Sequence, residues 1–326
     1  MTDDVSIRRA ARDDLPAIVA LARRALGWSD TDTTFLEWKH FENPFGVSPM
    51  WVAVADDRIV GFRTFLRWEF VTPEGEVVRA ARAVDTATDP SFQGRGIFTR
   101  LTLDAVASLP DEGVALIFNT PNGKSLPGYL KMGWHEVGRL ALSVMPTSWR
   151  FPAVVATARQ AAGRWPLPTA RGESPLEVFA RGELDELLAA QPSGPALRTR
   201  RTREFLSWRY GNEALGYRVA LLGDDDLAAG FAVFRRRRRG RAVEGVVCDV
   251  LAPHGHEPTV RRLVRQVAGM ADADYLIRLD RRVVTGDPFV RLPGAGPVLA
   301  CRPLDATAAP PDPRGWALTM GDVELF

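Results

Sequence analysis

Apolar and polar positions in the first half of the chain alternate between the short period of strands and the longer period of helices. Val5–Arg8 predicts an opening strand, and the apolar residues Ile18, Leu21, Ala22 and Ala25 follow at helical spacing. Two hairpins are expected next, around the turns Asp56-Asp57 and Pro73-Glu74-Gly75. Their strands are Val52–Ala55, Ile59–Leu66, Arg67–Val71 and Val77–Asp85. This order predicts an α/β fold, a mixed sheet with helices on both faces.

The same order of elements occurs twice in the chain. Phe35-Leu36-Glu37-Trp38-Lys39-His40 is matched by Phe205-Leu206-Ser207-Trp208-Arg209-Tyr210, and a strand-borne glycine follows each run, Gly61 and Gly230. The distance from phenylalanine to glycine is 26 residues in the first copy and 25 in the second. Each copy continues with a strand that reaches an aspartate (Asp85, Asp249), then an apolar helix and another strand (Val114–Phe118, Tyr275–Leu279). We interpret this as a duplicated α/β unit.

The boundary between the copies is expected behind Leu140–Met145, which we interpret as the last strand of the first unit. A helix near Val154–Arg164 and a cluster of proline and glycine are typical of a linker. We predict a first domain over 1–148, a linker over 149–174 and a second domain over 175–326. The second domain should open with a strand at Leu176–Phe179 and a helix at Glu183–Ala190.

One segment of the first copy has the features of a phosphate-binding loop. The run Gln93-Gly94-Arg95-Gly96 links a strand to a helix that begins at Ile97. Its two glycines let the backbone approach a ligand closely, and the helix N-terminus presents unpaired N–H groups at the positive end of its dipole. The loop has neither the GxGxxG of a dinucleotide-binding fold nor the Gly-Lys-Ser/Thr of a P-loop.

With Pro90 three residues ahead of it, this loop resembles the acyl-CoA loop of the GNAT acetyltransferase superfamily, whose pattern is Gln/Arg-x-x-Gly-x-Gly/Ala. Phe98 departs from it, because a small residue is usual there. The order of elements from Val5 to Val144 is similar to the GNAT fold as well. The resemblance implies two tandem GNAT-like mixed sheets flanked by helices, the second degenerate, as in Eis-like proteins. It also implies acetyl-CoA as the acyl donor, bound by Thr86, Ala87, Thr88, Gln93, Gly94, Arg95, Gly96, Ile97, Phe98, Thr99 and Asn119.

The resemblance also implies a general acid. The run Gly128-Tyr129-Leu130-Lys131-Met132-Gly133-Trp134 is similar to the family's Tyr-x-Lys-x-Gly-Phe, whose tyrosine lies near the thioester sulfur. A phenol can donate a proton to a thiolate leaving group at neutral pH. Packing of Tyr129 under the sheet is the alternative interpretation. The resemblance further implies a bulge near Thr86–Thr88 that separates the fourth strand from the fifth and leaves room for the pantetheine arm.

The general base is less well defined. Asp85 is the first candidate, and a structural aspartate that caps the loop is an equal alternative, because Asp249 holds the same place in the second copy. Glu37 and Glu69 remain alternatives. Eis-like proteins also suggest the terminal carboxylate, which we do not adopt.

In the second copy, the segment Ala252–Pro258 replaces the glycine loop, so we expect this unit to bind no cofactor and to shape the acceptor cleft. The arginines of Arg235–Arg239 predict a solvated hairpin tip, with an anion site as the alternative. His254 and His256 lack a third ligand nearby, so we expect no metal site.

Composition bounds the remaining choices. The 326 residues are 46% hydrophobic and 25% charged, with a formal net charge of +2, which gives no reason to expect nucleic acid or a membrane as partner. The N-terminal residues lack a signal-like apolar core, and Cys248 and Cys301 lack metal spacing, so we expect a cytoplasmic protein with free thiols.

The sequence predicts an acyl-CoA-dependent N-acetyltransferase that acts on an amine of a small molecule or peptide. A non-catalytic acyl-CoA-binding protein, and a transferase that uses a carrier-protein or aminoacyl-tRNA donor, are the alternatives.

Overall fold

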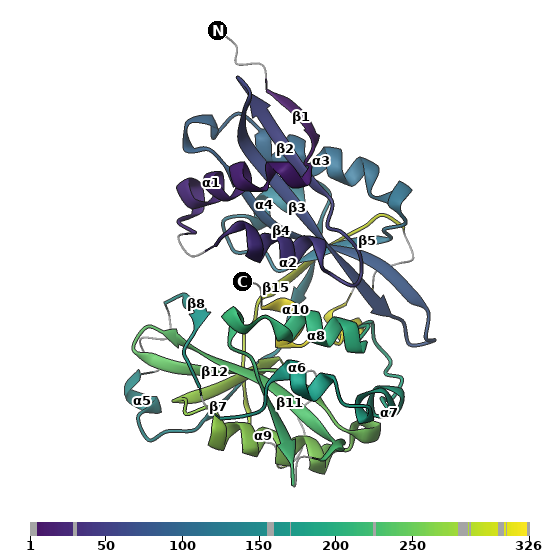
Figure 1. The fold of residues 1–326 in the computed structure, drawn as a ribbon, viewed down its shortest axis with the longest axis vertical. Helices are drawn as coiled ribbons and strands as arrows, with labels where there is room; N and C mark the ends of the chain where they lie inside the picture. The colour runs from purple at the N-terminus through teal and green to yellow at the C-terminus, as the bar shows by residue number, and fades with distance from the viewer. Residues whose placement is uncertain are drawn as a thin grey trace. The chain divides into compact units, whose positions relative to one another are not determined.

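The computed structural model describes residues 5–28, 31–154, 160–169, 171–223, 226–279, 286, 288–305, 310 and 312–324. The chain forms two compact units (Figure 1). The first comprises Met1–Thr72, Glu76–Gly138 and Val298–Asp312, and the second comprises Pro73–Gly75, Arg139–Pro297 and Pro313–Phe326. In the described part of the chain, no helix is long and apolar enough to cross a membrane.

A mixed sheet forms the centre of the first unit. Its elements are, in chain order, β1 (Ser6–Arg9), α1 (Leu15–Leu26), α2 (Thr33–Phe41), β2 (Met50–Ala55), β3 (Arg58–Val71), β4 (Val77–Thr88), α3 (Ile97–Ser108), β5 (Leu116–Asn119), α4 (Leu126–Lys131), β6 (His135–Arg139) and β15 (Val298–Pro303). The strand order is β1-β2-β3-β4-β5-β15-β6, with β4 and β5 parallel and the hairpins antiparallel. The predicted strands and both predicted turns are present, and β3 continues without a break from Arg58 to Val71.

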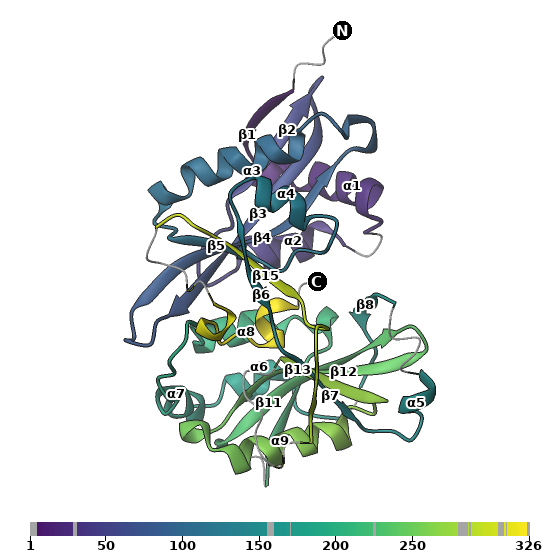
Figure 2. The ribbon, with the colours of Figure 1, turned by 180° about the vertical axis from the view of Figure 1, so that it is seen from behind.

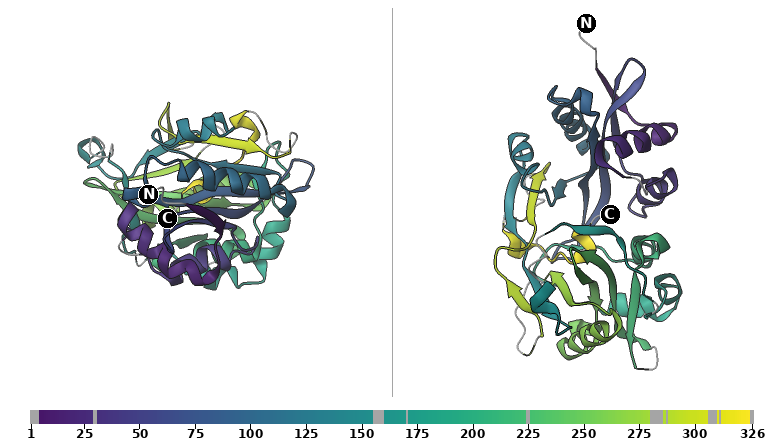
Figure 3. Two further views of the ribbon diagram at one scale, coloured as in Figure 1. Left: turned by 90° about the horizontal axis from the view of Figure 1, so that it is seen from above. Right: turned by 90° about the vertical axis from the view of Figure 1, so that its left-hand side faces the viewer.

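Helices cover both faces of this sheet. α1 and α2 lie on one face, and α3 and α4 lie on the other (Figures 1 and 2), as the view from above also shows for α1 and α3 (Figure 3, left). Ile97 and Leu101 of α3 belong to a buried apolar core with Phe65 and Ile117 of the sheet. Gly61 permits this contact, because a Cβ there would lie 2.8 Å from Cγ2 of Ile97. The start of α3 therefore rests directly on β3.

The second unit repeats this architecture. Its elements are β7 (Leu142–Pro146), α5 (Phe151–Val154), β8 (Ala162–Pro166), α6 (Pro175–Phe179), α7 (Glu183–Ala189), β9 (Arg198–Thr199), α8 (Arg203–Gly211), β10 (Arg218–Leu222), β11 (Asp226–Arg239), β12 (Ala242–Leu251), α9 (Glu257–Met270), β13 (Tyr275–Leu279), β14 (Val290–Leu292) and α10 (Met320–Val323). The sheet order is β10-β11-β12-β13-β7-β14, with β8 paired to β11. The series α2-β2-β3-β4-α3-β5 thus recurs as α8-β10-β11-β12-α9-β13, which agrees with the predicted duplication.

The last strands differ from the prediction. The strand expected at Leu140–Met145 to close the first sheet is β7 (Leu142–Pro146), which pairs with β13 in the second sheet. In return β15, from near the C-terminus, pairs antiparallel with β5 in the first sheet. β7 therefore belongs to the second sheet and β15 to the first, and the units do not divide at the predicted residues 148 and 175.

Two further expectations were wrong. Leu176–Phe179 belongs to the helix α6, because Ser174 and Pro175 begin a helix there, and a short apolar run does not by itself distinguish a strand from a buried helix. Ala162–Arg164, expected in a linker helix, lie in strand β8, which pairs with β11.

Candidate active site

The first sheet opens where β4 and β5 separate. The two strands pair only from Ala80 to Arg82, opposite Leu116 to Phe118, although β4 continues to Thr88. The separation predicted between the fourth and fifth strands is therefore present, and it begins before the glycine loop.

A β-bulge lies on β4 at this point. Arg63 of β3 is opposite Thr86, whereas the next residue, Thr64, is opposite Val84, so Asp85 is the extra residue. Asp85 adopts a positive φ of 31°, which aspartate tolerates better than most residues. The bulge precedes the predicted positions Thr86–Thr88 by one residue.

The glycine loop has the predicted geometry. Gly94 and Gly96 have φ angles of 76° and 73°, and a Cβ on either would meet nothing within 4 Å, so the space beside the loop is open. Gly96 is the N-cap of α3 and no side chain caps this helix end. The first N–H groups of α3 are therefore available to an anionic ligand.

A cavity of about 290 Å³ lies beside this loop. Eight of the predicted cofactor-binding residues line it, together with the end of α1 and Phe92. The lining residues are Ala25, Leu26, Thr86, Ala87, Thr88, Phe92, Gln93, Gly94, Gly96, Ile97 and Phe98. The cavity thus runs from the helix N-terminus to the bulged strand.

The other three predicted binding residues lie outside this lining. The Arg95 guanidinium stacks on the Phe92 ring at 4.6 Å, and Thr99 is exposed on the first turn of α3. Asn119 ends β5, where its buried side-chain oxygen has no hydrogen-bond partner among the described residues. A buried acceptor without a partner is uncommon and fits a site that receives a donor from a ligand. The pantetheine amides of acyl-CoA supply such donors, so the open glycine cradle and Asn119 both fit this group.

Tyr129 lies behind Phe98, which contacts both the cavity and the tyrosine. The two rings meet edge to face at 5.8 Å, and Trp134 packs on the other side of Tyr129 at 5.2 Å. The Tyr129 hydroxyl accepts a hydrogen bond of 2.6 Å from Nη2 of Arg63. Arg63 was not among the predicted site residues, although a charged residue inside an apolar strand is a signal that the sequence contains.

Asp85 is a buried, ion-paired carboxylate. Its Oδ2 accepts from Nζ of Lys39 at 2.7 Å and from Nε2 of His40 at 2.9 Å, both on α2. Burial opposes its ionisation, but the charge of Lys39 and the hydrogen bonds outweigh burial and hold the pKa of Asp85 well below its usual range. A general base needs a pKa near the working pH, so this geometry favours the structural interpretation of Asp85.

The second unit supports that interpretation. Asp249 accepts hydrogen bonds from Tyr210, which holds the place of His40 in the repeat, and from Arg201 at 2.5 Å. The alternatives for the base also lie away from the cavity lining. Glu37, on α2, forms an ion pair with Arg12 at 3.7 Å. Glu69 lies opposite Arg79 in the β3–β4 hairpin. The terminal carboxylate of Phe326 lies outside the described residues.

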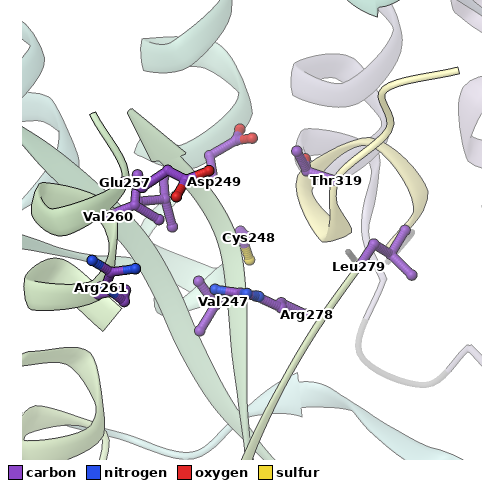
Figure 4. Close-up of a pocket in the computed structure, with 10 residues that line it drawn as sticks. Val247, Cys248, Asp249, Glu257, Val260, Arg261, Arg278, Leu279 and Thr319 are labelled. Atoms are coloured by element: carbon purple, nitrogen blue, oxygen red, sulfur yellow. The ribbon is translucent and has the colours of Figure 1, made fainter. Parts of the chain in front are cut away.

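The second unit keeps the opening in its sheet but not the loop. β12 and β13 pair from Glu244 to Val246 and then separate around a cavity of about 200 Å³. Figure 4 shows its lining, Val247, Cys248, Asp249, Val250, Glu257, Val260, Arg261, Arg278, Leu279 and Thr319. Glu257 brings a carboxylate to the first turn of α9, and Pro258 removes an N–H there. Both features disfavour a bound pyrophosphate.

The arginine run is not a solvated tip. Arg235, Arg237 and Arg239 alternate toward the inside of the second unit, where Glu324 and Glu244 pair with them. Arg235 and Glu324 form a bidentate pair at 2.8 and 3.1 Å. Successive side chains of a strand point to opposite faces, so every second arginine points inward and the predicted solvated tip is wrong.

Comparison with known proteins identifies the first unit. Residues 6–137 match the family model described as an acetyltransferase (GNAT) domain. This part of the chain is therefore similar to the GNAT acetyltransferase domains. No sequence among the curated proteins matches the chain significantly.

Solved structures are similar in fold over more of the chain than residues 6–137. The GCN5-related N-acetyltransferase from Kribbella flavida superposes with a TM-score of 0.61 at 16% identity, over 94% of this chain and 73% of that one. The corresponding protein from Anabaena variabilis gives a TM-score of 0.62 at 13% identity, over 92% and 72%. Eis1 from Mycobacterium abscessus gives 0.56 at 16% identity, over 94% and 75%. The fold of both units, two mixed sheets flanked by helices, is thus similar to the fold of these solved structures.

Proposed function

We propose that the chain transfers an acetyl or other short acyl group from acyl-CoA to an amine, and that the GNAT domain performs this reaction. The observation that carries the proposal is the loop with Gly94 and Gly96 at the start of α3, which opens onto a cavity beside the separated strands. Bound acyl-CoA supplies a thioester, whose acyl carbon is open to attack by an amine and whose thiol is the leaving group.

The residues of the loop hold the donor. The N–H groups from Gln93 to Thr99 bind the pyrophosphate, because they combine free donors with the positive end of the α3 dipole. The backbone from Thr86 to Thr88 lies along the pantetheine arm, and Asn119 accepts one of its N–H groups. The acceptor amine then enters where β4 and β5 separate.

Two proton movements complete the reaction. The new C–N bond forms as the C–S bond breaks, the electron pair of that bond stays on sulfur, and the Tyr129 hydroxyl donates its proton to it. The amine releases its proton to solvent, because Asp85 is engaged with Lys39 and His40. We place this activity in the cytoplasm, consistent with the free thiols of Cys248 and Cys301.

Titration calorimetry with acetyl-CoA tests the proposal. The wild-type chain should bind it, and Gly96→Asp should abolish binding, because a carboxylate would stand where the phosphates approach. Gly75→Asp is the matched control, since Gly75 also has a positive φ of 93° and open space around it, at the tip of the β3–β4 hairpin. Unchanged affinity in Gly96→Asp would contradict the proposed donor site.

Release of free thiol in the presence of an amine panel then separates the enzyme from its alternatives. Turnover with acetyl-CoA supports a transferase. Tight binding without turnover for any amine would favour a non-catalytic acyl-CoA-binding protein, and turnover only with a carrier-bound acyl group would favour a different donor.

A further inference from the structure

Arg63 is a buried cation with no role in the reaction steps proposed above. Its side chain is 1% exposed on β3, on the same face as α3. In the described part of the chain, no carboxylate lies within ion-pair distance of its guanidinium, and its Nε has no hydrogen-bond partner. Among the residues that the structure describes, Arg63 is therefore a desolvated positive charge without a counter-ion.

The surroundings of Arg63 compensate this charge only in part. Its guanidinium lies 4.9 Å from the Phe65 ring, 5.3 Å from Phe98 and 5.4 Å from Tyr129, which gives cation–π attraction. Nη1 donates to the Val84 carbonyl at 3.4 Å, just before the bulge. Nη2 donates to the Tyr129 hydroxyl at 2.6 Å. A buried charge without a partner is costly, so its retention indicates a negative charge that arises beside it.

We propose that Arg63 is a positioning residue for Tyr129 and carries the charge that develops on the phenol oxygen. The inference rests on the proposed function. Because Nη2 of Arg63 already donates to that oxygen, the hydroxyl hydrogen is free to point at the thioester sulfur. The bond to Val84 fixes the guanidinium, and through it Tyr129, to the bulged strand.

The charge balance explains why a guanidinium suits this place. When the C–S bond breaks, the proton moves from Tyr129 to sulfur and leaves a phenolate. The hydrogen bond from Arg63, whose donor is already charged, then joins two opposite charges at a buried place and becomes stronger. Arg63 thus stabilises the transition state more than the ground state, which is what accelerates a reaction. Solvent returns the proton to Tyr129 after the thiol leaves.

Binding of two ligands tests this without turnover. CoA has a thiol that ionises as the pH rises into the alkaline range, whereas S-ethyl-CoA has no ionisable thiol. In the wild-type chain the affinity for CoA relative to S-ethyl-CoA should rise about tenfold between pH 7 and pH 9, the size expected for a hydrogen bond to a charged group. The ratio should stay flat in Arg63→Met and in Tyr129→Phe.

A matched control separates this effect from loss of any buried arginine. Arg82 is equally buried on the neighbouring strand but donates to Thr120. Arg82→Met should keep the pH-dependent preference for CoA. Arg63→Met should not reduce the stability of the first unit, since it removes a charge without a counter-ion. Should it fail to fold, Arg63→Lys and Tyr129→Phe decide, and both should weaken the preference.

Turnover gives the second readout. Arg63→Met and Tyr129→Phe should each lower kcat about 10²-fold with little change in the affinity for S-ethyl-CoA, and the double variant should be no slower than either single one. A wild-type kcat in Arg63→Met, or additive losses in the double variant, would overturn the inference. Failure of S-ethyl-CoA to bind the wild type would instead refute the proposed function.

Discussion

Asp85→Asn tests whether Asp85 is a chemical or a structural residue. The substitution keeps the shape of the side chain and its tolerance of positive φ, and removes only the charge. It leaves the Lys39 ammonium, which is 0% exposed, without the carboxylate that lies 2.7 Å from it. At an effective dielectric constant of about 20, the gross attraction at that distance is about 6 kcal/mol.

The expected loss of stability is smaller than that attraction, because the amide oxygen of the new side chain can still accept hydrogen bonds. Removal of one partner from a buried ion pair costs about 3–5 kcal/mol. Such a loss lowers the protection of slowly exchanging amides roughly 10²- to 10⁴-fold. Asp89→Asn is the control, because its partner Arg24 lies 3.4 Å away and is half exposed, so about 1 kcal/mol or less is expected.

Hydrogen exchange followed by mass spectrometry on the full chain is the assay. Peptides from α2 and β4 should lose protection in Asp85→Asn, and peptides from β12 and β13 serve as an internal reference. Wild-type protection of α2 and β4 in Asp85→Asn would refute a structural role for this carboxylate. In that case a 10²-fold loss of kcat at normal stability would identify Asp85 as a general base.

Two further predictions concern pH and stoichiometry. Burial lowers the pKa of His40, so His40 stays neutral in the fold and gains a proton on unfolding. The first unit should therefore lose stability as the pH falls below about 6.5. Urea titrations at pH 7.5 and 5.5 should show a loss of unfolding free energy at the lower pH for the wild type and a smaller loss for His40→Gln. Equal losses in the two proteins would refute the prediction. Calorimetry should give one acetyl-CoA per chain, and two would contradict the effect assigned to Glu257 and Pro258.

Local signals account for what the sequence predicted well. The hairpin turns, the helix that begins at Ile97 and the glycine loop that precedes it all depend on residues next to one another. The loop and most residues of the cavity lining could therefore be named in advance. The order of elements in the second unit could be predicted for the same reason, because the second half of the sequence repeats the local pattern of the first.

Nonlocal contacts account for what it missed. Nothing in Leu142–Pro146 specifies which of two similar parallel strands it joins, so its pairing with β13 could not be read from the pattern. Arg63 and Tyr129 are 66 residues apart in the chain, and their hydrogen bond depends on how α4 packs on the sheet. The inward arginines were a different kind of error, since the strand period could have revealed them.

The exchanged strands have a consequence for synthesis on the ribosome. β5 ends at Asn119, but the strand that pairs beside it begins only at Val298. At about 5–20 residues per second, translation of the intervening segment takes roughly 10–35 s. During that time the outer edge of β5 lacks its final neighbour, and such an edge invites pairing with other chains. A chain that ends after its first half would lack β15 and so form an incomplete first sheet. The two halves of this protein should therefore be expressed together and not as separate fragments.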